Sequence, residues 1–123
     1  MAGLGTPFIS ETVVGLGAVM NPTAGQTLAS IASGSLGAGY WSLRIVGGAY
    51  AAAPVTSTPK VNNTNLMRGA SVYAQLFNMP GFGQEEAIWY LSLAAGDSLS
   101  VVAIATETTG ITYNIGLRAT RVA

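Results

Sequence analysis

The sequence contains no cysteine and no histidine, and only 8% of its residues are charged. The absence of cysteine excludes a disulfide framework and any thiolate metal site, and it leaves the redox compartment open. The absence of histidine removes the side chain that most often acts as a general base near neutral pH. We therefore expect no enzyme activity, no catalytic residues, no cofactor and no bound metal.

The few charges of the chain are balanced and scattered. Five basic and five acidic residues give a formal net charge of +0 at pH 7, whereas charged residues make up roughly 25% of an average soluble domain. Scattered charges form no basic patch, so we expect neither a nucleic-acid nor a membrane partner. A surface this poor in charge is either covered by small polar residues or buried against other subunits. We favour burial, which predicts a non-covalent homo-oligomer, with a trimer as the first hypothesis.

Residues 12–43 carry no charge, yet they do not have the pattern of a membrane span. Asn21, Pro22, Gln26 and repeated glycines break the segment into short apolar pieces, whereas a transmembrane helix needs about 20 predominantly apolar residues. The N-terminus also lacks the basic region and compact apolar core of a signal peptide. We expect a protein that is made in a cytoplasm without export.

Alternation of apolar and polar residues, rather than a helical stripe, dominates the chain and predicts an all-β protein. In residues 111–120 every second residue is apolar or small, as in a half-buried strand. Residues 85–93 and 98–106 alternate in the same way, and the second segment is apolar on both faces, as in a central strand. Gly96 and Asp97 supply the turn between these two segments.

Further strands are predicted upstream of this region. Residues 39–50 indicate a strand, and residues 65–77 indicate a hairpin that turns at Gly69. The whole chain yields roughly seven or eight short strands, which predicts a single antiparallel β-sandwich of jelly-roll type. The alternation places the following side chains in the core: Trp41, Leu43, Ile45, Trp89, Leu91, Leu99, Val101, Ile115 and Leu117.

The first 38 residues differ from the rest of the chain in composition, since they are rich in Gly, Ala, Ser and Thr. We interpret residues 1–25 as an N-terminal extended arm or first strand, and residues 26–123 as the β-sandwich domain. Apolar patches this short do not form a core alone, so removal of residues 1–20 is expected to leave the domain folded and to weaken attachment to a partner. Apolar side chains in the arm and at a Pro-Gly loop tip are candidate partner contacts: Phe8, Ile9 and Phe82.

Three short patterns have a chemical interpretation, and each is weaker than its structural one. Glu85 and Glu86 are the only close pair of carboxylates, but adjacent strand residues point to opposite faces and do not converge on a substrate. Asp97 lacks neighbouring oxygen ligands for calcium, and we expect its side chain to bond its own turn. The stretch "GLGAVM", which begins at Gly15, has two glycines of a dinucleotide loop but no helix pattern after it.

Two aromatic pairs raise the question of a carbohydrate-stacking platform. Tyr40 precedes Trp41, and Trp89 precedes Tyr90. Because adjacent strand residues face opposite ways, each pair is expected to send its tryptophan into the core. Exposed tryptophans would instead favour a lectin-like module.

Two segments carry a resemblance to known families. "YLSLAAGDSLSV", followed by "ITYNIGLRATRV", resembles the closing strands of the TNF/C1q-like jelly rolls, in which a Gly-Asp turn joins two strands and a last strand is built around an aromatic residue and a glycine. Residues 39–123 also resemble small β-sandwich proteins that are encoded among tailed-phage virion genes. The positions that carry the first resemblance are Leu91, Leu93, Gly96, Asp97, Leu99, Val101, Tyr113 and Gly116.

This resemblance implies a trimeric jelly roll that decorates or tips a virus particle without catalysis. The first hypothesis is a structural protein of a tailed-phage virion, namely a capsid decoration (cement) protein. It would be made in the host cytoplasm, reside in the virion and bind the major capsid protein or another virion protein as a homotrimer. Two alternatives stay open: a head-fibre, neck or tail-tip domain that binds a host surface, and a lectin-like carbohydrate-binding module.

Overall fold

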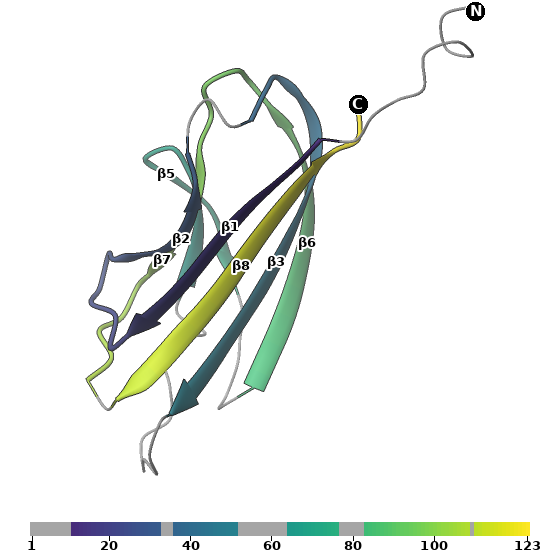
Figure 1. Cartoon of the computed structure of the whole chain (residues 1–123). Coiled ribbons are helices and arrows are strands. Elements are labelled where there is room, and N and C mark those ends of the chain that lie inside the picture. Colours follow the sequence, from purple (N-terminus) through teal and green to yellow (C-terminus); the bar gives the residue numbers. More distant parts are fainter. Residues whose placement is uncertain (1–10, 33–35, 52–63, 77–82, 109) are drawn as a thin grey trace, which may run out of the picture.

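The computed structural model describes residues 11–32, 36–51, 64–76, 83–108 and 110–123. Within these ranges the chain forms strands and no helix, as the alternation predicts. Two antiparallel sheets of four strands pack together as a β-sandwich (Figure 1). The strands are β1 (Thr12–Met20), β2 (Thr27–Ile31), β3 (Gly39–Ala51), β4 (Thr64–Arg68), β5 (Ser71–Leu76), β6 (Gly83–Leu93), β7 (Leu99–Ala103) and β8 (Ile111–Arg121).

The strand order is that of a jelly roll. One sheet has the order β1-β8-β3-β6 and the other the order β2-β7-β4-β5. The antiparallel pairs β1–β8, β2–β7, β3–β6 and β4–β5 are those of one long hairpin folded at its middle. Rolling this hairpin up brings β3 against β8 and β4 against β7, which completes the two sheets. The sandwich and its jelly-roll character, both predicted from the sequence, are confirmed.

The core lies between the sheets and follows the predicted alternation. In β8 every second residue from Ile111 to Ala119 is buried, and β7, between β2 and β4, buries Leu99 and Val101. Of the predicted core residues all are buried except Trp89, which is partly buried. Trp89 lies on the edge strand β6, where its ring meets that of Tyr73 edge-on, with centroids 5.9 Å apart. Its partial exposure reflects this position at the margin of the sandwich.

The first strand belongs to the sandwich, which corrects the expected arm. β1 pairs with β8 along its entire length, and its inward Val13 and Val19 pack against the core. For Thr12–Met20 the structure thus agrees with the first-strand alternative and not with the arm. Removal of residues 1–20 would delete this complete strand, so we now expect it to destabilise the domain. Residues 1–10 lie outside the described residues.

Two glycines let β1 approach the opposite sheet unusually closely. A Cβ atom at Gly17 would overlap the carbonyl oxygen of Leu28, and one at Gly15 would overlap that of Ser30. Leu28 and Ser30 both belong to β2. Gly15 and Gly17 therefore face the other sheet, at a point where the backbones of β1 and β2 lie close together. The "GLG" stretch is thus explained by packing of strand against strand.

Truncation of a central core residue tests the face assignment of β8. Leu117 is 0% exposed, and Leu117→Ala is expected to lower the free energy of unfolding by about 2–5 kcal/mol through lost burial and a residual cavity. Reversible urea unfolding measures this loss. Val72→Ala is the control, because Val72 is 60% exposed on β5, and it should change stability by less than about 0.5 kcal/mol. Similar losses for the two variants would contradict the assignment.

Addition of a single methyl group tests the close approach of β1 to β2. Gly17→Ala forces the backbone of β2 to move and is expected to lower the free energy of unfolding by about 1–3 kcal/mol, as overpacking does. Gly37→Ala is the matched control, since a Cβ atom there would lie 3.9 Å from the Arg121 Nη1 atom, an ordinary contact. Equal effects of the two alanines in urea unfolding would show that the sheets are not in close contact at Gly17.

Candidate interaction surface

The predicted contact residues Phe8, Ile9 and Phe82 lie outside the described residues.

The carboxylates of the adjacent residues Glu85 and Glu86 do not converge. Glu86 accepts a hydrogen bond from the Arg44 Nε atom (2.7 Å) on the outer side of its sheet, whereas Glu85 is exposed at the alternate position of β6. Among the residues described, no group of three or more carboxylates forms a possible metal site.

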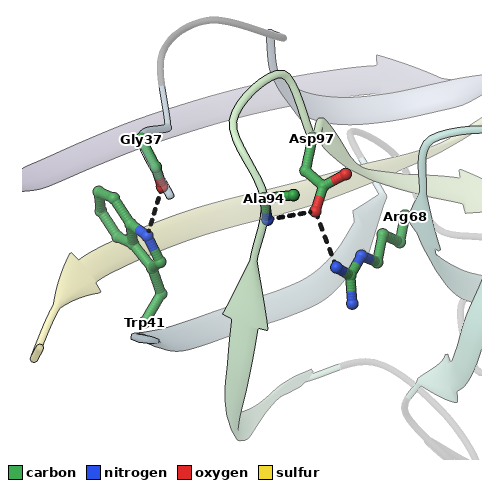
Figure 2. Close-up of polar contacts among 5 residues, drawn as sticks. All are labelled: Gly37, Trp41, Arg68, Ala94 and Asp97. Atoms are coloured by element: carbon green, nitrogen blue, oxygen red, sulfur yellow. Dashed lines mark hydrogen bonds and ion pairs between the residues drawn. The ribbon is translucent and has the colours of Figure 1, made fainter. Parts of the chain in front are cut away.

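Asp97 bonds its own turn, as predicted from the sequence (Figure 2). Its Oδ2 atom accepts hydrogen bonds from the backbone N–H of Ala94 (2.8 Å) and from the Arg68 Nη2 atom (2.8 Å). The hydrogen bond from Ala94 is the main cause that lowers the pKa of Asp97, and Arg68 adds to it. Asp97 thereby ties the β6–β7 turn to the end of β4, which is a structural role.

Glu107 is a buried carboxylate that the sequence analysis missed. It is 3% exposed, and its Oε2 atom accepts a hydrogen bond from the Tyr113 hydroxyl at 3.4 Å. The backbone N–H of Glu107 donates to the carbonyl oxygen of Pro22 (2.9 Å). A glutamate in a threonine-rich turn suggests an exposed residue. The one available signal was that Tyr113, on the buried face of β8, needs a partner for its hydroxyl group.

The tryptophans face inward and the tyrosines beside them face outward. Trp41 is fully buried, and its Nε1 atom donates to the carbonyl oxygen of Gly37 at 3.0 Å (Figure 2). Tyr40 and Tyr90 are 42% and 59% exposed, and their rings stack with centroids 6.3 Å apart and an interplanar angle of 17°. The only exposed aromatic pair among the described residues is thus made of tyrosines.

The outer face of the β1-β8-β3-β6 sheet, meaning the side turned away from the other sheet, is unusually apolar. Leu16 on β1 is 80% exposed, the largest fraction among the large hydrophobic side chains described. The register of the four strands places on this face seven of the eleven exposed large hydrophobic residues among the described ranges: Val14, Leu16, Met20, Tyr40, Tyr50, Ile88 and Tyr90. The sequence analysis missed this face, because it took β1 as a possible arm.

A shallow depression runs along the middle of the outer face. Gly116 on β8 lies in register with Leu16 on β1 and Val46 on β3, and its missing side chain leaves a hollow of about 460 Å³ between them. Asn114 lines this hollow, and Arg118 lines a second hollow that shares Gly116. The hollow therefore has apolar walls at Leu16 and Val46 and a glycine floor, and the neighbouring row of side chains places Arg118 and Arg44 on the two middle strands.

The charges near this face are unevenly paired. Arg44 forms an ion pair with Glu86 across β3 and β6. Arg118 lies opposite Arg44 in the β3–β8 ladder and makes no ion pair with any described residue. Glu85, at the start of the edge strand β6, is also exposed without an ion partner in the described ranges. Among the exposed charged side chains of the described ranges, Arg118 and Glu85 are thus left without an ion pair.

Comparison of the chain with protein-family models, with curated proteins and with solved structures found no match in any of the three. In the part of the chain that the structure describes, no helix is long and apolar enough to cross a membrane. Evidence for function therefore comes from the chain itself, above all from the outer face.

Acid unfolding tests the role of Asp97. The folded state holds the pKa of Asp97 below its ordinary value, so the ionised side chain stabilises the fold at neutral pH, and this contribution is lost as the pH falls through the folded pKa. Wild-type protein should lose more stability between neutral pH and about pH 3 than Asp97→Asn does. Urea unfolding across this range measures the difference, with Val72→Ala, at an exposed and uncharged site, as the control. Parallel losses in wild type and Asp97→Asn would contradict this role.

Proposed function

We propose that this protein is a structural component of a tailed-phage virion, and specifically a capsid decoration (cement) protein that binds the assembled shell as an oligomer. The observation that carries the proposal is the exposed apolar outer face of the β1-β8-β3-β6 sheet. Monomeric soluble proteins rarely expose contiguous apolar patches larger than a few hundred Å². A face of this kind supports a function based on association.

The construction of the face suits a permanent contact. It is carried by antiparallel strands of 9 to 13 residues that pair along most of their length, so its backbone is ordered before any partner arrives. A preorganised surface avoids the entropy loss that a flexible loop pays on binding. Rigid, neutral sheets are suited to close packing in a particle.

All the described acidic side chains except Glu85 are engaged in ways that favour a structural role. Glu86, Asp97 and Glu11 form ion pairs with arginines, and Glu107 is buried against Tyr113. Paired and buried carboxylates of this kind hold strands and turns in place. They support a scaffold more than a reactive centre.

The lectin-like alternative lacks the feature that would favour it, because Trp41 is buried and Trp89 is only partly exposed. The exposed Tyr40–Tyr90 pair is the remaining aromatic platform. Stacked pairs of this geometry also stabilise the sheets that carry them. We therefore retain the decoration protein as the proposal.

Binding to shells that lack this protein tests the proposal. Purified protein is expected to cosediment with such shells and to raise the temperature at which they open, because a ligand that binds only the intact shell stabilises it by mass action, by about 2.7 kcal/mol per site at a free concentration of 100 Kd. Cosedimentation and calorimetry of the loaded shells provide the measurements. An unrelated jelly-roll protein is the control. Protein that remains entirely in the supernatant up to high micromolar concentration would overturn the proposal.

A further inference from the structure

The outer face has the size of a protein–protein interface. Its shortest strand, β1, contains 9 residues. With a rise of about 3.3 Å per residue and a strand spacing of about 4.8 Å, four strands cover roughly 600 Å² before the relief of the side chains is counted. A stable interface of standard size buries about 800 Å² per partner. Coverage of this face by one partner therefore buries an area close to what a stable complex needs.

The unpaired charges of Arg118 and Glu85 indicate which kind of partner fits the outer face. A partner that covers the face must also cover Arg118, which already lies opposite another cation, Arg44. Like charges in this arrangement destabilise a sheet, and a buried cation without an anion is strongly unfavourable. The partner must therefore supply an acidic group in an otherwise neutral, apolar surface. The chain itself carries such a group, since Glu85 at the start of β6 is exposed and has no ion partner among the described residues.

We infer that the outer face of the β1-β8-β3-β6 sheet binds a second copy of this chain, with Leu16 and Val46 in its apolar centre and Arg118 paired with Glu85 of the neighbouring copy. The inference rests on the proposed function, because it names the surface through which the proposed oligomer forms. Arg118 lies on the interior strand β8 and Glu85 on the edge strand β6. Arg118 projects from the outer face, whereas Glu85 occupies the alternate position of β6, on the opposite side of the sheet from Glu86. A contact between these two different surfaces is head-to-tail, and a contact of this type can close into a ring such as a trimer.

A charge placed in the apolar centre tests the surface. Light scattering and sedimentation across a dilution series are expected to show an oligomer for wild type, and Leu16→Lys should raise the dissociation constant by more than about 100-fold because it buries a second cation beside Arg118, with which it lines one hollow. The matched control is Val72→Lys, since Val72 is similarly exposed, at 60%, on the other sheet. A wild-type monomer of 12.5 kDa at high micromolar concentration overturns the inference. Dissociation by Val72→Lys and not by Leu16→Lys also overturns it.

A charge exchange tests the pairing of Arg118 with Glu85. Arg118→Glu should weaken association about 10-fold or more, while the fold is retained, because the new glutamate lies opposite Arg44 within the sheet. The double variant Glu85→Arg/Arg118→Glu should restore association to near the wild-type level. Circular dichroism and cooperative unfolding verify that each variant is folded. A double variant that associates no better than Arg118→Glu overturns this pairing.

These experiments separate the inference from the proposed function, because self-association is measured on the free protein without shells. A monomer that still binds shells overturns the inference alone. An oligomer that does not bind shells overturns the proposed function alone.

Discussion

The antiparallel ladder between β3 and β8 is the constraint on which both the core and the outer face depend. It joins eleven residues of each strand, from the Trp41–Arg121 pair to the Ala51–Ile111 pair, without interruption. Because side chains alternate along a strand, this single register directs Leu43 and Leu117 inward and Arg44 and Arg118 outward. A slip by one residue would exchange the two sets. Arg44 and Arg118 thus become cross-strand neighbours, which is unfavourable, because Leu43 and Leu117 beside them in the sequence are buried.

The fold was largely predictable because most strands alternate clearly. From Ile111 to Ala119 of β8, buried residues alternate with outward Thr, Asn, Gly and Arg, so the sequence alone distinguishes the faces. β1 does not offer this signal, since Val13 and Val14 are both apolar although only Val14 is exposed. The contacts of β1 with β2 in the other sheet decide which face of β1 points inward. These tertiary contacts cannot be seen in the local sequence of β1. For the same reason the outer face was not predicted, and the burial of Glu107 depends on Tyr113 and Pro22, which lie elsewhere in the sequence.

The low charge content and the apolar outer face have a common physical consequence. Three ion pairs join described residues, and they use six of the ten charged side chains of the chain. Little charge remains to keep separate molecules apart, and a net charge near zero promotes association. A chain that functioned as a free monomer would be exposed to aggregation under these conditions. Specific coverage of the outer face by a partner would remove the same surface from water in a defined way, in keeping with the proposed function.

β1 contributes both to the stability of the sandwich and to the surface of the proposed assembly. Its inward glycines, Gly15 and Gly17, permit contact with the backbone of β2, and its outward Val14 and Leu16 form one side of the apolar face. As an edge strand without charge it would also be a template for uncontrolled pairing with other chains. Close packing against β2 holds this edge in place. A change that displaces β1 from β2 therefore affects the core, the apolar face and the protection of the edge together.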